Sequence, residues 1–185
     1  EKKVYINDGN TYVQKGLPLY FKFSTSPGGE MFDLNSKATS KYASPMYLDT
    51  EGINYIRSRY AVDPETKKTV QPQQEVLYEL YADGLAPITR LKYDGAPKYR
   101  SDRTYFGKGL TFSLSAKDGV SGVEKIHYAV NSATWTDYSG TTNMDQEGEF
   151  SLSWYAHDNV GNAEQLKNSK IVVDLSAPSS NFNLF

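Results

Sequence analysis

The sequence predicts an all-β protein made of two tandem antiparallel β-sandwich domains. Three observations favour this class. Apolar and polar residues alternate along many short segments, Gly, Asn, Asp and Pro cluster between those segments, and the chain repeats itself at an interval of roughly 90 residues. No long stretch keeps the helical period of ~3.6 residues together with helix caps. Regularly spaced short strands in modules of this size are typical of β-sandwiches.

The internal repeat predicts the domain boundaries. Three short motifs occur twice, in the same order and at nearly the same offset. The pairs are residues 11–17 with 104–110, 60–63 with 155–158, and 80–87 with 171–178. We therefore expect a first module at 1–88, a second module at 89–180, and the start of a following segment at 181–185.

The alternation of apolar residues predicts where the strands lie. The clearest sets are Leu17, Leu19, Phe21 and Phe23; Leu110, Phe112, Leu114 and Ala116; Ile126, Tyr128 and Val130; and Phe150, Leu152, Trp154 and Ala156. Between Ile53 and Val62 the apolar residues change from one parity to the other, which predicts a β-bulge. Trp154 shares the inward parity of Phe150, so we assign it to the core.

Composition excludes several functional classes. The chain carries 20 Lys and Arg against 22 Asp and Glu, and its isoelectric point is about 5.7. It lacks the excess of positive charge that binds nucleic acids and anionic lipid surfaces. No apolar run approaches the roughly 18 residues that cross a bilayer. We therefore expect neither nucleic-acid binding nor a membrane-spanning segment. The sequence also has no Cys, so thiol catalysis and thiolate metal sites are excluded.

The second module contains a series of motifs in a fixed order: a strand that ends at Asp118, a Ser-Gly-Val turn at 121–123, Asp-Asn-Val-Gly-Asn at 158–162, and Ala-Pro at 177–178. With these motifs it resembles the bacterial Ig-like repeat that occurs in tandem in secreted and outer-envelope proteins. The aromatic-centred hairpin around Trp135 also fits, which assigns Trp135 to packing. The first module is similar to the Ig-like domain of chitobiase-type glycosidases, through residues 21–24, 42–48, Gly52 and 60–63, although it lacks the Ser-Gly-Val turn.

These resemblances imply two tandem Ig-like antiparallel β-sandwich domains without catalytic activity. The implied location is extracellular, at the cell surface or in the periplasm, within a longer chain with adjacent domains. The implied function is that of a spacer and an adhesion or binding surface for a protein or glycan ligand. The alternative is a pair of accessory domains, contacting carbohydrate or providing distance, in an extracellular carbohydrate-active enzyme.

The sequence contains few candidate catalytic residues. His127 lies on a predicted strand whose alternation points it outward, as an exposed polar residue. His157 stands beside Asp158, but no Gly-x-Ser-x-Gly elbow accompanies this pair. Neither a Gly-x-Gly-x-x-Gly motif nor a Walker-type phosphate loop is present. We therefore expect no catalytic residues and no organic cofactor.

A calcium-binding site is a more specific hypothesis than an enzyme active site. In an Ig-like sandwich the loop after the second strand and the loop before the last strand emerge at the same end, which places Asp118 near Asp158, Asn159 and Asn162. Oxygen-rich side chains with turn carbonyls are the ligands that calcium selects. The alternative is that each Asp or Asn caps its own turn. Thr25 occupies the position equivalent to Asp118, so we expect any site to be confined to the second module.

Tyrosines and long loops are candidate recognition surfaces. The chain has 15 Tyr, and exposed Tyr provides contact area for proteins or sugars at low entropic cost; the alternative is that Tyr is simply favoured in strands. Two polar loops of the first module, at 24–41 and 63–74, are expected to share one end of the sandwich. The tyrosines outside the inward parities are Tyr5, Tyr12, Tyr20, Tyr93, Tyr99 and Tyr105.

Overall fold

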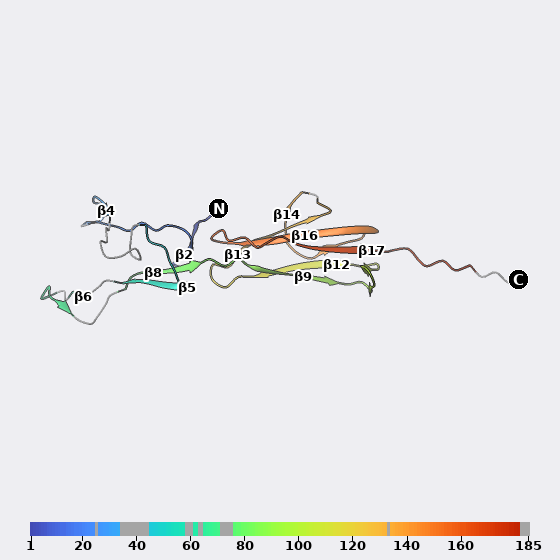
Figure 1. Ribbon diagram of the computed structural model, residues 1–185, viewed down its shortest axis with the longest axis horizontal. Helices are drawn as coiled ribbons and strands as arrows, with labels where there is room; N and C mark the ends of the chain where they lie inside the picture. Colours follow the sequence, from blue (N-terminus) through green and yellow to red (C-terminus); the bar gives the residue numbers. More distant parts are fainter. Residues whose placement is uncertain are drawn as a thin grey trace. The chain divides into compact units, whose positions relative to one another are not determined.

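The computed structural model describes residues 1–24, 26–33, 45–57, 61–62, 65–70, 76–132 and 134–181, and these consist of β-strands, turns and extended segments (Figure 1). The all-β prediction is confirmed for these residues. They include no helix long and apolar enough to cross a membrane. The chain divides into two compact units. The first comprises Glu1–Leu85, Asp118–Gly122 and Asp158–Asn162, and the second comprises Ala86–Lys117, Val123–His157 and Ala163–Phe185.

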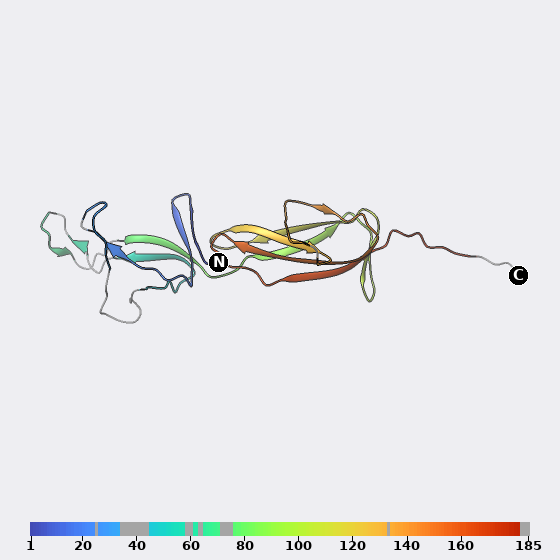
Figure 2. The same ribbon diagram turned by 90° about the horizontal axis from the view of Figure 1, so that it is seen from above.

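The first unit is built on a four-stranded sheet with the order β1-β2-β8-β5. The strands are β1 (Val4–Asn7), β2 (Asn10–Gln14), β8 (Val76–Asp83) and β5 (Gly52–Arg57). β2 pairs with β8 in parallel, and the other neighbours are antiparallel (Figures 1 and 2). The register shifts between Ile56 and Arg57, but the residue that the pairing skips is Leu77 of β8, so the irregularity lies near the predicted position and its extra residue belongs to the partner strand. Two short ribbons pair β3 (Lys22–Phe23) with β4 (Phe32–Asp33) and β6 (Ala61–Val62) with β7 (Thr69–Val70).

The continuous strand predicted over residues 17–23 is wrong. Leu17 lies in a turn, Leu19 makes an isolated bridge to Met46, and regular pairing begins only at β3. Pro18 supplies the reason, because proline has no N–H to donate to a ladder. Leu17 and Leu19 nevertheless pack against the small core of this unit, which contains Val13, Leu48 and Ala82.

The second unit contains a six-stranded and a three-stranded sheet. The larger has the order β10-β11-β17-β16-β13-β14, with the strands β10 (Lys98–Arg100), β11 (Thr104–Phe106), β17 (Lys167–Val173), β16 (Gly148–Asp158), β13 (Val123–Val130) and β14 (Thr136–Asp137). The smaller has the order β15-β12-β9, with the strands β15 (Thr142–Asn143), β12 (Thr111–Lys117) and β9 (Ile88–Asp94). β16 and β17 run side by side and antiparallel (Figure 2).

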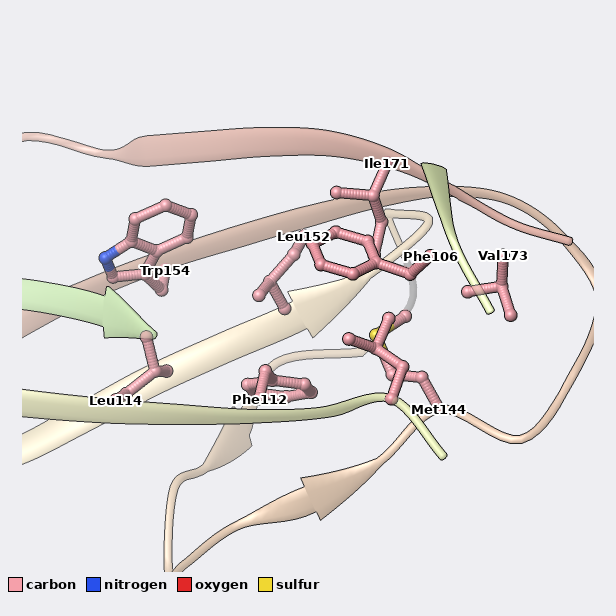
Figure 3. Packing of buried hydrophobic residues seen from close by; sticks show 9 residues of the cluster. Phe106, Phe112, Leu114, Met144, Leu152, Trp154, Ile171 and Val173 are labelled. Carbon is pink, nitrogen blue, oxygen red and sulfur yellow. The ribbon is translucent and has the colours of Figure 1, made fainter. Parts of the chain in front are cut away.

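Both sheets of the second unit contribute to one hydrophobic core (Figure 3). Phe112 and Leu114 of β12 pack with Leu152 and Trp154 of β16 and with neighbouring side chains of β11 and β17. The alternation predicted for β12 and β16 is therefore confirmed. Trp135, also assigned to packing from the sequence, makes an edge contact with Tyr155 but is 44% exposed and lies outside this core.

The strand pairing repeats at positions that the sequence repeat relates. Val13 on β2 lies opposite Ala82 on β8 in a parallel pair, and Phe106 on β11 lies opposite Val173 on β17, also in parallel. The antiparallel partners of β8 and β17 occupy equivalent positions as well. Gly52 of β5 pairs with Ala82, and Gly148 of β16 pairs with Val173. The two halves of the sequence thus share one local topology around their last strand.

Gly95, in the turn after β9, cannot be replaced without strain. Its φ is +82°, and a Cβ added there would lie 2.5 Å from the carbonyl oxygen of Gly109. We expect Gly95→Ala to lower the free energy of unfolding by about 1–2 kcal/mol, measured by urea titration. Gly140→Ala is the matched control, because a Cβ at Gly140 meets open space. Equal effects of the two substitutions would contradict this assignment.

Candidate metal centre

Three carboxylates from distant parts of the sequence converge in the first unit. Asp83 ends β8, Asp118 follows β12, and Asp158 ends β16. Each contributes one oxygen to a group in which all three oxygens lie within 4.8 Å of one another. Asp83 and Asp158 are completely buried, and Asp118 is partly buried. The predicted proximity of Asp118 and Asp158 is confirmed, but the expectation that only the second module contributes is wrong, because Asp83 belongs to the first.

Asp118 organises the first of the two loops. Its Oδ2 accepts hydrogen bonds from the backbone N–H groups of Val120 (3.0 Å) and Gly122 (2.9 Å). Gly122 has a φ of +81°, a left-handed conformation that glycine adopts without the penalty of a Cβ. The carboxylate therefore caps its own turn, as the alternative interpretation of the sequence proposed, while Oδ1 accepts no hydrogen bond from the described residues.

Asp158 organises the second loop in the same manner. Its Oδ1 accepts three backbone N–H groups, those of Val160 (3.0 Å), Gly161 (2.7 Å) and Asn162 (2.8 Å). Its Oδ2 accepts one hydrogen bond, from the Asn162 side chain at 2.6 Å. The spacing Asp-x-x-Gly-Asn thus produces a tight turn that points one carboxylate inward.

Asp83 joins both loops to the end of β8. Its Oδ2 accepts from the backbone N–H of Ser121 at 3.0 Å. Its Oδ1 accepts from the N–H of Leu85 at 3.2 Å and from the side-chain amide of Asn162 at 3.3 Å. Without Asp83 the two loops would lose their common anchor in the first unit.

The two asparagines support the carboxylates rather than adding ligand oxygens. The amide nitrogen of Asn159 donates to the carbonyl oxygens of Ser121 (2.8 Å) and Gly122 (3.0 Å). The amide nitrogen of Asn162 faces Asp83 and Asp158, while its Oδ1 accepts from Gln14 at 2.9 Å. Of the four residues predicted as metal ligands, Asp118 and Asp158 thus belong to the carboxylate group, and the amide nitrogens of Asn159 and Asn162 hold the loops, while metal binding itself stays a prediction.

The electrostatics of this cluster favour a cation. Burial raises the pKa of Asp158, and the neighbouring charge of Asp83 raises it further, against hydrogen bonds from Asn162 and Val160 that lower it. Among the described residues, no Lys, Arg or His nitrogen forms an ion pair with any of the three carboxylates. Buried carboxylates without a counter-charge are costly, and a bound cation is one remedy.

Oxygen atoms for such a cation are available. A carboxylate has about four lone-pair sites, and the hydrogen bonds described above leave capacity on Asp118 Oδ1, Asp83 Oδ2 and Asp158 Oδ2. The hydroxyl of Ser121, a residue only 6% exposed, is buried and has no hydrogen-bond partner among the described residues. Ca²⁺ takes 6–8 oxygens at about 2.3–2.6 Å, so oxygens up to ~5 Å apart can share one ion. The 4.8 Å cluster meets this requirement.

Sequence reasoning missed Asp83. The repeat aligns it with Asp174, which is exposed and caps a turn through the N–H of Ser176 at 3.0 Å. Asp83 therefore resembled a routine module-end residue. Its special role depends on the loops at 118–122 and 158–162, whose contacts with β8 no local pattern reveals.

The other predicted surface residues fall into separate groups. Tyr5 and Tyr12 form a row with Tyr81, whereas Tyr20 and Tyr99 stand exposed at 63% and 68%. Tyr93 is not a surface residue, since it packs against the core of the second unit. Half of each proposed recognition loop, at 24–41 and at 63–74, lies outside the described residues.

The geometry is the basis for assigning a role to this chain. The arrangement can hold a hard divalent cation with carboxylate, hydroxyl and water oxygens, and it can order two loops around that ion. Neither models of known protein families nor the curated proteins yield a match to this sequence.

Proposed function

We propose that this chain is a non-catalytic, calcium-stabilised segment of a secreted or cell-envelope protein that acts as a spacer and as a binding surface. The observation that carries the proposal is the convergence of Asp83, Asp118 and Asp158, whose carboxylate oxygens lie within 4.8 Å of one another. An ion at this point binds the folded state alone, because three distant segments form the site only after folding. Calcium would therefore act as a structural element.

The expected affinity agrees with an extracellular location. Calcium sites in extracellular modules bind with dissociation constants of about 10⁻⁴–10⁻³ M, weaker than those of intracellular sensors. The three carboxylates already accept hydrogen bonds from backbone N–H groups, which leaves fewer lone pairs for an ion and suits this weaker class. Such a site is filled wherever calcium is millimolar and empty where calcium is scarce.

We further propose that both modules are tandem Ig-like β-sandwiches. Two features support this assignment: the equivalent pairing of early and last strands in the two halves, and the single core that two sheets share in the second unit. Antiparallel sheets packed over one core are the defining property of a sandwich. A spacer role suits repeated modules of this kind.

A row of tyrosines supports the binding role. Tyr5, Tyr12 and Tyr81 occupy directly opposed positions on β1, β2 and β8, with ring centroids 5.9 Å and 5.1 Å apart along the row. Tyr55 lies on the same face by strand alternation and is 46% exposed. Adjacent aromatic rings offer flat apolar area with hydroxyl groups at the rim, which suits a protein or glycan ligand.

Arrays of glycans and matrix proteins, probed with the whole chain in millimolar calcium, test the binding role. We expect a signal that Tyr12→Ser and Tyr81→Ser weaken at least tenfold. Tyr20→Ser is the matched control, since Tyr20 is exposed and lies outside the row. A wild-type chain that binds nothing, or row variants that bind as wild type does, would contradict the assignment of the row.

The same row also favours a second candidate, an accessory role in an extracellular carbohydrate-active enzyme. Tyrosine rings stack on sugar faces and their hydroxyl groups hydrogen-bond to sugars. Polysaccharide binding without any matrix-protein binding would support this candidate over adhesion. The reverse pattern would support adhesion.

A further inference from the structure

The two histidines of the chain, the only two in its sequence, lie next to each other on neighbouring strands of the second unit. His127 is on β13 and His157 is on β16. His127 Nε2 and His157 Nδ1 are 3.1 Å apart, and the rings are nearly parallel, with centroids separated by 4.9 Å. The side chains are 17% and 25% exposed, so His127 is more covered than the sequence pattern indicated. Solvent can reach this pair, but bulk water does not surround it.

Each histidine presents its other ring nitrogen to a carboxylate. His127 Nδ1 lies 2.8 Å from Asp137 Oδ1, and His157 Nε2 lies 3.5 Å from Glu124 Oε2. A carboxylate only accepts hydrogen bonds, so the 2.8 Å contact with Asp137 places a hydrogen on His127 Nδ1 and leaves His127 Nε2 as an acceptor in the neutral ring. His157 Nδ1 can then donate to His127 Nε2 at 3.1 Å, so the two inner nitrogens face the same space.

Without a metal the two inner nitrogens share one hydrogen, and a metal ion that replaced this hydrogen would contact both nitrogens at once. We propose that His127 and His157 form a two-imidazole binding site for a divalent transition-metal ion such as Zn²⁺, with His127 Nε2 and His157 Nδ1 as the ligand atoms. Imidazole suits zinc, copper and nickel. Water completes the coordination shell, because the described residues offer no third nitrogen ligand at this position.

The distances fit such an ion. Zn–N bonds measure about 2.0–2.1 Å, so nitrogens 3.1 Å apart subtend an angle of about 95–100° at the metal, between octahedral and tetrahedral values. Metal-bound histidines almost always donate their other N–H to a carboxylate or carbonyl, which fixes the tautomer. Asp137 supplies this feature for His127, and the Glu124 carboxylate lies 3.5 Å from His157 Nε2. Lys125 holds Asp137 in place through a 2.6 Å ion pair with Oδ2.

This site differs from the aspartate cluster in chemistry and in orientation. Calcium selects oxygen ligands, whereas the pair offers nitrogen to softer ions. His157 and Asp158 are consecutive on β16, and consecutive strand residues point to opposite faces. Saturating calcium should therefore leave the histidine site open.

Titration calorimetry with Zn²⁺ on the whole chain, in saturating calcium, tests the proposal. We expect one zinc ion per chain. His127→Gln and His157→Gln should each weaken binding at least tenfold, because a single imidazole remains. Asp137→Asn should weaken it by about 10–100-fold while keeping the stoichiometry, since it removes the charge that orients His127.

Asp94→Asn is the matched control for Asp137→Asn. Asp94 is also an exposed carboxylate paired with a lysine, Lys92, but no histidine contacts it. Zinc should bind this variant with wild-type affinity. Absence of saturable zinc binding to the wild-type chain, or wild-type affinity in either histidine variant, would overturn the proposal.

The wild-type chain gives a second reading that needs no substitution. The imidazole proton resonances of its only two histidines should shift together and saturate together at one zinc equivalent. Independent shifts, or a shift in one histidine alone, would show that the rings do not share an ion.

Discussion

We expect calcium added to metal-free protein to raise the midpoint of thermal unfolding, and we expect Asp118→Asn to remove this response. An ion that binds only the folded state stabilises it by about 2.7 kcal/mol at a concentration one hundred times its dissociation constant. For a domain of this size that corresponds to a rise of about 10 °C or more. The measurement is differential scanning calorimetry in calcium and in excess chelator.

Asp118→Asn separates metal binding from loop structure. An asparagine oxygen can still accept the N–H groups of Val120 and Gly122, and the new amide group replaces the oxygen that has no hydrogen bond among the described residues. In chelator the variant should therefore be at least as stable as wild type, since one of three clustered negative charges is gone. Lower stability in chelator, or an undiminished calcium response, would contradict the assignment.

Asp174→Asn is the matched control for this prediction. Asp174 also caps a turn, through the N–H of Ser176, but it is exposed and does not belong to the carboxylate cluster. Its substitution should leave the calcium response unchanged. A lost response in this control would show that the effect is not specific to the aspartate cluster.

Removal of Glu164 should destabilise the second unit by about 3 kcal/mol. The Glu164 side chain is only 8% exposed, and it accepts hydrogen bonds from the Thr89 N–H (2.9 Å) and hydroxyl (2.6 Å) and from Lys167. The indole N–H of Trp154 donates to the same Thr89 hydroxyl at 2.9 Å, which ties the network to the core. Glu164→Ala leaves the N–H and hydroxyl of Thr89 without their acceptor, and each such loss costs about 1–3 kcal/mol. It also removes the counter-charge of Lys167, which keeps its 2.8 Å hydrogen bond to the Thr89 carbonyl oxygen. Urea titration measures the change.

The effect of Glu164 should depend on pH in a defined direction. Burial raises the pKa of Glu164, but hydrogen bonds from Lys167 and Thr89 outweigh it, and the pKa lies below the ordinary value of 4.5. A lowered pKa in the folded state contributes stability above the unfolded value, and that stability is lost as the pH falls through the folded pKa. The difference between wild type and Glu164→Ala should therefore be full at neutral pH and shrink below about pH 4.5.

Glu149→Ala is the control for the buried network. Glu149 is paired with Arg103, but both side chains are more than half exposed. An exposed pair of this type contributes only about 0–1 kcal/mol. Equal losses from Glu149→Ala and Glu164→Ala would contradict the role of burial.

The sequence predicted the fold class because apolar and polar residues alternate along every strand that has one buried face. β12 and β16 kept their predicted parity, whereas the irregularity near the predicted bulge has its extra residue, Leu77, on the partner strand β8. Prediction failed at residues 17–23, where Pro18 interrupts an otherwise regular alternation. The alternation of apolar residues reports where side chains point, whereas strand pairing also requires a backbone N–H donor, which proline lacks.

The site was predictable only in part, for a related reason. Asp118 and Asp158 stand in turns with a recognisable local spacing, so their proximity followed from the expected topology. Asp83 and the histidine pair depend on which residues oppose each other across the fold. Local patterns reveal the turn that a carboxylate caps, but the register between distant segments is a property of the whole structure.

The most direct measurement is calorimetric titration of metal-free protein with calcium. We predict one calcium ion per chain with a dissociation constant of about 10⁻⁴–10⁻³ M, and no comparable binding of magnesium, which dehydrates reluctantly and demands stricter geometry. Asp118→Asn should abolish the signal. Absence of saturable binding at about 10 mM calcium, well above that range, would contradict the central claim and leave Asp83, Asp118 and Asp158 as residues that only cap and join turns.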